Sequence, residues 1–373
     1  MCRGAVGEQM GILYFLLTIF IFGILVLVHE GGHFLLARAN GIEVQEFAIG
    51  MGPKILSRVS KKSGIRYSLR LFPIGGFVSM TGEDGEEEGY EGENGAEDGD
   101  EGKNGVAGNP NAFCNKSVWR RMVTILAGPL TNILIGVLCM LILVCASGPL
   151  ASTTVAEFSD DAKSSAWLKT GDKIVSVDGV PVHTGNELVY EIMNSGYEAI
   201  DITVVRDGKK ITLEGVEFPT FSESGATFGD ADFKPYAEKR NVGTVLKHAF
   251  FRSLSTIKMI WDSIIDMIRG RYGVEAVSGP IGITETVGTA VKAGGFLNLL
   301  YLFVVLAMNL GVVNLLPIPA LDGGRFVFLL IEGIIGRPLN RKVESYVNGI
   351  GLIILMALMV LVAFKDIFTL IRK

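Results

Sequence analysis

Four long apolar runs limit what this chain can fold into. They lie at residues 10–36, 117–147, 295–324 and 345–365, and each reaches the ~20 residues that a helix needs to cross the hydrocarbon core of a bilayer. The chain of 373 residues is 49% hydrophobic, with a mean hydropathy of +0.41. The first run exceeds the ~7–15-residue core of a secretory signal and is followed by no A-x-A pattern, so we expect it to be retained. The sequence therefore predicts a multi-pass α-helical membrane protein with about four transmembrane helices.

The segments between these runs have the patterns of soluble or surface-bound structure. Residues 42–81 alternate apolar and polar side chains between glycines and prolines, which predicts a membrane-associated β segment. Residues 150–220 contain several short alternating stretches, which predicts a soluble α+β domain. Residues 241–270 have apolar side chains at helical spacing. That pattern predicts an amphipathic helix, which either lies in the membrane interface or packs on the soluble domain.

Residues 82–112 form an acidic, glycine-rich segment. It has too few apolar side chains to offset the entropy lost on ordering, so the composition predicts a disordered loop. A tolerated insertion is the simpler interpretation, and a role in regulation or cation binding is the alternative.

Basic residues gather between the first two apolar runs: Arg38, Lys54, Arg58, Lys61, Lys62, Lys116, Arg120 and Arg121. Since cytoplasmic loops are enriched in Lys and Arg, we expect this segment inside the cell and residues 150–220 outside it, in a protein of the plasma or inner membrane. Arg372 and Lys373 would then lie outside, in mild conflict with the same rule. The sequence has no stripe of basic residues that would suggest a nucleic-acid partner.

The first apolar run ends in the stretch ILVLVHEGGHFLLAR, residues 24–38. Ionisable groups in such a segment are costly unless they have a function. His29 and His33 are four residues apart and can bind one metal ion from the same helix face, while Glu30 can take a proton from metal-bound water. This H-E-x-x-H pattern predicts a zinc site with a glutamate base. The alternative is a pair of interface histidines that reach toward the lipid headgroups.

Zinc in a catalytic site takes a third protein ligand. His183 and His248 lie in segments that favour structural or solvated roles. Asp322, in NLLPIPALDGG at the end of the third run, is the carboxylate in a matching membrane environment. It is the predicted third ligand, and a helix cap at a glycine-rich turn is the alternative.

These residues resemble those of the site-2 proteases, a family of intramembrane zinc metalloproteases, and in particular its bacterial RseP type. The similar segments follow one another along nearly the whole chain: HEGGH at 29–33, LFPIGGFVSM at 71–80, AGPLTN at 127–132, LKTGDKIVSVDGVPV at 168–182, SGPIGI at 278–283 and NLLPIPALDGG at 314–324. Residues 168–182 resemble a strand and turn of a PDZ domain, and the length of the soluble region allows only one such domain. We expect this domain outside the cell and the active site toward the cytoplasm. That domain would either bind an exposed C-terminus or act as a size filter.

The resemblance also implies Zn²⁺ as the cofactor, the bilayer as the environment and single-pass transmembrane proteins as substrates. Such substrates include anti-sigma factors already trimmed outside and remnant signal peptides, and an upstream protease of the site-1 type is a further candidate partner. A substrate helix must be unwound before it is cut, and the alternating segment that includes Gly75 and Gly76 offers a strand edge for this. Asn314 is expected to hold substrate, and Pro317 and Pro319 to open space near Asp322.

Two other classes of function fit parts of the sequence. One is a catalytically inactive, PDZ-bearing membrane scaffold, which the intact Glu30 argues against. The other is a transporter with an ion path through His29, Glu30 and Asp322, which the lack of an evident inverted repeat argues against.

Overall fold

The computed structural model describes residues 2–83, 106, 108–223, 225–271 and 278–372, so most of the predicted acidic loop at 82–112 lies outside the described residues. The chain divides into two compact units. The first unit comprises Met1–Ile135, Gly279–Ala293 and Leu306–Lys373, and the second comprises Gly136–Ser278 and Gly294–Val305.

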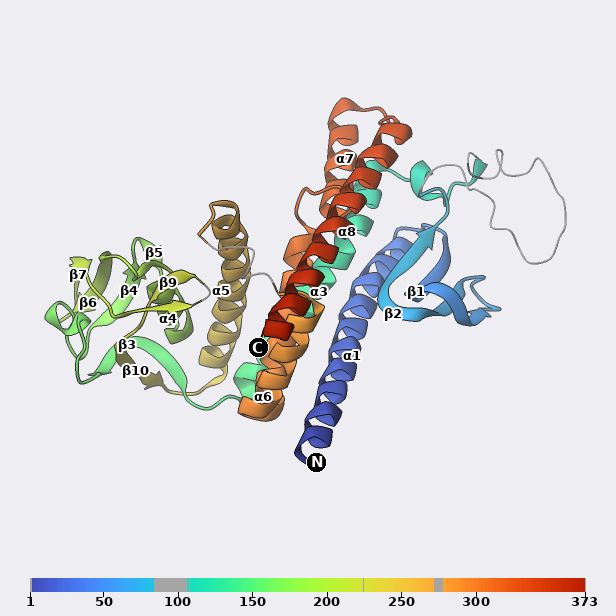
Figure 1. Ribbon diagram of the computed structural model, residues 1–373. Coiled ribbons are helices and arrows are strands. Elements are labelled where there is room, and N and C mark those ends of the chain that lie inside the picture. Colours follow the sequence, from blue (N-terminus) through green and yellow to red (C-terminus); the bar gives the residue numbers. More distant parts are fainter. Residues whose placement is uncertain (1, 84–105, 107, 224, 272–277, 373) are drawn as a thin grey trace. The chain divides into compact units, whose positions relative to one another are not determined.

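Four helices in the described part of the chain are long and apolar enough to cross a membrane (Figure 1): α1 (Cys2–Ala39), α3 (Val118–Ala146), α6 (Pro280–Asn314) and α8 (Arg341–Arg372). Their candidate spans have mean hydropathies between 2.2 and 2.8. This matches the expectation of about four transmembrane helices.

The third predicted span, 295–324, differs from the structure at its C-terminal end. α6 ends at Asn314, and Asp322 begins a separate helix, α7 (Asp322–Ile335). Pro317 and Pro319 cannot continue a helix, because proline lacks the amide N–H and clashes with the preceding turn. α6 is also interrupted at Gly294 and Gly295, where Gly295 has a φ of +58°.

Strands β1 (Val44–Val59) and β2 (Arg66–Met80) form an antiparallel hairpin in the first unit. The half near α1 contributes to a core with α1, α3 and α7, made of Ala37, Ile42, Val44, Ile65, Val78, Met80, Phe113, Met122, Ile125 and Leu329. The hairpin also exposes large apolar side chains: Met51, Ile55, Leu56, Val59, Tyr67, Leu69, Leu71 and Phe72.

The second unit contains an antiparallel sheet with the strand order β10-β3-β4-β6-β7, and β5 pairs with β4. These strands are β3 (Leu150–Phe158), β4 (Lys173–Val177), β5 (Val180–Pro181), β6 (Ile200–Arg206), β7 (Lys209–Val216) and β10 (Phe233–Glu238). A further hairpin comprises β8 (Thr220–Glu223) and β9 (Ala226–Gly229), and helix α4 (Gly185–Ser195) packs against β3, β4 and β9. The predicted domain end at residue 220 stops short of β10, because the pairing of β10 with β3 is non-local.

Helix α5 (Val242–Ile268) begins with a capping box between Asn241 and Thr244. It packs on the soluble domain: Asp262 accepts a hydrogen bond of 2.8 Å from Tyr190 of α4, and His248 lies 3.2 Å from Glu238 of β10. Its other face exposes apolar side chains, namely Val242, Leu246, Phe250, Leu254 and Trp261. The predicted amphipathic helix thus packs on the soluble domain, while its location in the membrane interface stays a prediction.

Candidate metal centre

Helix α1 carries three ionisable side chains near its C-terminal end, His29, Glu30 and His33. The two histidines are almost fully buried, with ring centroids 4.9 Å apart and Nε2 atoms 3.3 Å apart. Residues four apart lie on one helix face, so this is the geometry that the spacing predicts.

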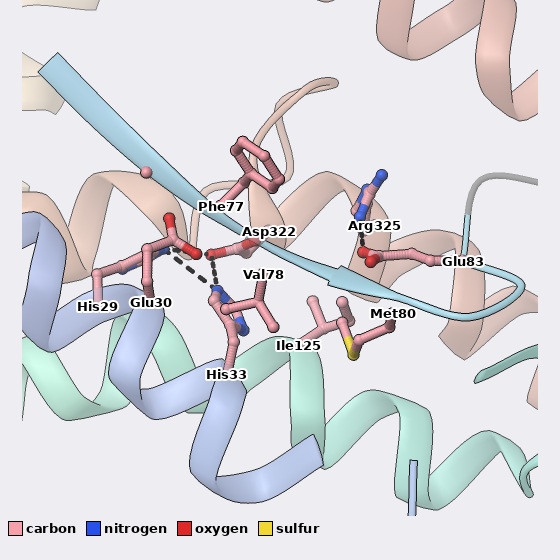
Figure 2. Close-up of a pocket in the computed structure, with 11 residues that line it drawn as sticks. His29, Glu30, His33, Phe77, Val78, Met80, Glu83, Ile125, Asp322 and Arg325 are labelled. Carbon is pink, nitrogen blue, oxygen red and sulfur yellow. Dashed lines mark hydrogen bonds and ion pairs between the residues drawn. The ribbon is translucent and has the colours of Figure 1, made fainter. Parts of the chain in front are cut away.

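Asp322, the first residue of α7, brings a carboxylate to the two histidines (Figure 2). Its Oδ2 lies 3.1 Å from His29 Nε2 and 3.3 Å from His33 Nε2. Although these are ion-pair distances, this buried oxygen accepts no hydrogen bond of acceptable geometry from any described residue. A buried oxygen without a hydrogen bond is costly, so we interpret the three converging atoms as ligands for a shared cation.

The donor set fits zinc. The two imidazole nitrogens and the carboxylate oxygen lie within 4.8 Å of one another. Catalytic zinc sites use three protein ligands of these types and leave a fourth position open for water. His29, His33 and Asp322 could therefore hold the predicted ion.

The turn before α7 explains why this sequence places Asp322 at the site. Ala320 has a φ of +70°, and its amide N–H donates to Asn348 Oδ1 of α8 at 3.1 Å. A Cβ atom on Gly323 would collide with the carbonyl oxygen of Leu316, and one on Gly324 with that of Ile318. The two glycines of the L-D-G-G pattern thus let the first turn of α7 pack directly on the preceding backbone.

Helix α3 supports the two histidines from behind. His33 Nδ1 lies 2.9 Å from the carbonyl oxygen of Thr124, and His29 Nδ1 lies 3.2 Å from Asn132 Nδ2. A Cβ atom on Gly128 would collide with the imidazole of His33. The A-G-P-L-T-N segment therefore provides both the space and the polar partners for the histidines.

The three predicted ligands open onto a cavity of about 140 Å³. Strand β2 runs along one side of it, as Figure 2 shows. Its lining is His29, Glu30, His33, Gly76, Phe77, Val78, Met80, Glu83, Ile125, Asp322 and Arg325. The space holds a water molecule readily, and Glu30 shares it with the candidate ligands.

A larger cavity of about 610 Å³ shares Gly76, Asp322 and the Glu83–Arg325 ion pair with the first. It extends along α8, where its lining includes Asn348 and Leu352. Its size allows an extended peptide segment to approach Asp322.

The structure brings together some of the predicted site residues and not others. Glu30 and Gly76 line the smaller cavity. The described linings of the two cavities include neither Gly75 nor the residues of the α6–α7 turn that were expected to contact substrate: Asn314, Pro317 and Pro319. His183 and His248 belong to the second unit, where Glu187 and Glu238 are their partners.

Sequence reasoning assigned no role to Thr124, Gly128 or Asn132. Thr124 acts through its main-chain carbonyl group. Every residue has such a group, so the residue type at this position gives no sign of the role. Gly128 and Asn132 lie in the A-G-P-L-T-N segment, so that motif was an available signal. Their contacts with His33 and His29 depend on how α3 packs on α1, which spacing along the chain does not encode.

Comparison with known proteins gives matches over nearly the whole chain. A protein of Clostridium acetobutylicum is 34% identical over 355 residues, which cover 94% of this chain and 96% of that protein. The Regulator of sigma-W protease RasP of Bacillus subtilis is 32% identical over 413 residues, with 94% and 97% covered. Zinc metalloprotease RasP of Bacillus licheniformis is 32% identical over 416 residues, with the same coverage.

The family model of Peptidase family M50 matches residues 17–358. That match includes H-E-x-x-H on α1, the α3 segment behind it and L-D-G-G at the start of α7. The chain therefore belongs to peptidase family M50.

Proposed function

We propose that this chain is a zinc-dependent intramembrane endopeptidase of the site-2 type, which cleaves transmembrane segments of single-pass membrane proteins. The observation that carries the proposal is the convergence of His29, His33 and Asp322 on one point beside Glu30, within a unit built of apolar helices. Membership of peptidase family M50 and the names of the RasP relatives support it.

His29, His33 and Asp322 would hold Zn²⁺. Bound there, zinc would lower the pKa of water and polarise the scissile carbonyl group. The carboxylate of Asp322 balances charge in a site that is otherwise made of neutral imidazoles.

Glu30 is the proposed general base. It follows His29 directly, lines the same cavity and packs beside β2, since its Cγ would lie 3.0 Å from a Cβ atom on Gly76. From there it can take a proton from the attacking water and pass it to the leaving amide nitrogen. A site that only bound a structural metal would have no need of this carboxylate.

Strand β2 is the proposed docking edge for substrate. Among the described residues its C-terminal part, Gly76–Met80, pairs with β1 on one side only, so the other edge of this part can accept an unwound substrate segment as an added strand. Added main-chain hydrogen bonds would replace those that the substrate helix loses on unwinding. Gly75 and Gly76 would allow close approach of the substrate backbone, while Asn314, Pro317 and Pro319 would act through the turn that carries Asp322.

We place the protein in the cell membrane, with the metal site toward the cytoplasm. The sheet of the second unit, with α4, is the proposed PDZ-like domain outside, and we favour its action as a filter against bulky substrates. The Bacillus subtilis relative is named as a regulator of sigma-W, which supports trimmed anti-sigma factors as one substrate class. Remnant signal peptides are a second class, and a site-1-type protease would trim substrates first.

The test compares Asp322→Asn with Asp366→Asn, another buried aspartate of the first unit, whose carboxylate accepts a 3.0 Å hydrogen bond from the Gly282 amide. Zinc per chain and release of a fragment from a trimmed single-pass substrate are measured for both variants. We expect Asp322→Asn to lose zinc and cleavage, and Asp366→Asn to keep its zinc. Full zinc occupancy in Asp322→Asn would overturn the ligand assignment. A wild type that cuts none of several trimmed substrates despite bound zinc would favour the inactive scaffold.

A further inference from the structure

His33 has its ring orientation fixed by a main-chain group. Its Nδ1 lies 2.9 Å from the carbonyl oxygen of Thr124, and both residues are buried. A carbonyl oxygen can only accept, so Nδ1 carries the proton, and in the neutral ring Nε2 keeps its lone pair. This is the tautomer that a metal ion requires, and a main-chain acceptor holds it permanently.

His29 has a different kind of partner. Its Nδ1 lies 3.2 Å from the side-chain amide of Asn132, a residue that is 0% exposed. An amide contains one donor group and one acceptor group, so it can pair with either tautomer of the imidazole. With Asn132 Nδ2 toward the ring, Nδ1 accepts, and His29 Nε2 carries the proton that faces Asp322 Oδ2 at 3.1 Å.

This orientation leaves Asn132 Oδ1 buried without a hydrogen-bond partner in the part of the chain that the structure describes. Rotation of the amide by half a turn would bring that oxygen to His29 Nδ1. Nδ1 would then donate, and Nε2 would be free to bind a metal ion. Asn132 Oδ1 is thus the acceptor that the metal-binding tautomer of His29 needs.

We infer that Asn132 is the positioning residue for His29: its side-chain oxygen accepts the Nδ1 proton when Nε2 binds the metal, and its amide group holds the ring when the metal is absent. Removal of the hydrogen-bond partner of a metal-ligating histidine typically lowers metal affinity by about 10–100-fold. Asn132 acts through His29 and contacts neither the cavity nor the other two ligands in the described lining. The inference rests on the proposed zinc site.

The test measures the zinc dissociation constant of the detergent-solubilised full-length protein by competition with a chromophoric chelator. Asn132→Leu removes the acceptor at similar volume, and Asn132→Asp keeps an acceptor there. Thr18→Val is the matched control, because Thr18 is a buried residue of α1 whose hydroxyl donates to the carbonyl group of Tyr14 on its own helix, about three turns from His29. Thermal unfolding of each metal-free variant verifies that it is folded.

We expect the Kd for zinc to rise about 10–100-fold in Asn132→Leu and to stay within about threefold of wild type in Asn132→Asp and Thr18→Val. A purely packing role would give similar zinc affinity in the Leu and Asp variants, and that result would overturn the inference. So would wild-type affinity in Asn132→Leu. Because the readout is zinc affinity, a wild type that binds zinc but cleaves nothing would count against the proposed function alone.

Discussion

At the scale of single residues, the H-E-G-G-H stretch contains two glycines in opposite environments. A Cβ atom on Gly31 would meet nothing within 4 Å. A Cβ atom on Gly32 would collide with Thr131 Oγ1 and would lie 2.5 Å from the carbonyl oxygen of Ala127. Gly32 therefore sets how closely α1 approaches α3, and with it the distance from His33 to its partner Thr124.

Gly32→Ala should separate α1 from α3 and disturb the metal ligands, at a cost of about 1–3 kcal/mol for overpacking. Gly31→Ala should be neutral or slightly stabilising, since alanine favours the helix. The measurement is zinc per chain and the thermal midpoint of both variants. Equal behaviour of the two would show that the close approach of the helices is unimportant for the site.

At the scale of elements, α7 carries Asp322 and must be held against the rest of the first unit. Arg121 of α3 donates to Glu332 of α7, with one contact of 3.1 Å between Nη1 and Oε2. Arg121 is buried, and its guanidinium lies 6.0 Å from the ring centroid of Phe113. This ion pair is the polar link between the helix that supports the histidines and the helix that supplies the carboxylate.

Breaking this pair from one side leaves a buried charge without its partner. Arg121→Met or Glu332→Leu should therefore destabilise the protein by about 3 kcal/mol and reduce zinc content, while the double variant should recover much of the loss. Arg120→Met, at an exposed neighbouring position, is the control. Thermal unfolding in detergent measures the effect. Additive losses in the double variant would contradict a coupled pair.

The contact between α5 and β10 should depend on pH. Burial lowers the pKa of His248 below its ordinary 6.5 and outweighs the opposing effect of Glu238. Burial raises the pKa of Glu238, but hydrogen bonds from Lys247 and His248 bring the net value below 4.5. A group whose pKa is lower in the folded state than in the unfolded state contributes stability that is present above its unfolded-state pKa. That stability is lost as pH falls through its folded-state pKa.

Stability of the second unit should therefore decline as pH falls from about 7 toward 5, as His248 takes up a proton, and further below about 4.5, as Glu238 does. His248→Gln cannot gain this proton and should lose the part of the decline between pH 7 and 5. The thermal midpoint of wild type and variant at both pH values provides the comparison. An unchanged slope in His248→Gln would assign the pH dependence to other groups.

At the scale of the whole molecule, the proposed orientation places the β1–β2 turn inside the cell and the second unit outside. Lys62 lies in the β1–β2 turn and Lys209 begins β7, and both positions are exposed. In a variant whose four natural cysteines are replaced by serine, Lys209→Cys should react with an impermeant maleimide in intact cells, and Lys62→Cys only after lysis. The reverse pattern would invert the topology.

Sequence reasoning succeeded where the signal is local. Apolar runs predict helices, and the i, i+4 spacing of His29 and His33 predicts two imidazoles on one helix face. Predictions differed from the structure where distant segments meet. Examples are the pairing of β10 with β3, which extends the soluble domain beyond residue 220, and the contact between Asn132 and His29. The extent of the third span depended on whether the prolines at 317 and 319 end the helix or kink it, which tertiary packing decides.

The most direct test of the account compares wild type with Glu30→Gln, measuring zinc per chain and fragment release from a trimmed single-pass substrate in the same samples. We predict one zinc ion in both proteins, with fragment release by wild type that a zinc chelator abolishes and a loss of about 100-fold or more in Glu30→Gln. Cleavage by Glu30→Gln at the wild-type rate, or cleavage by wild type that persists without zinc, would contradict the account.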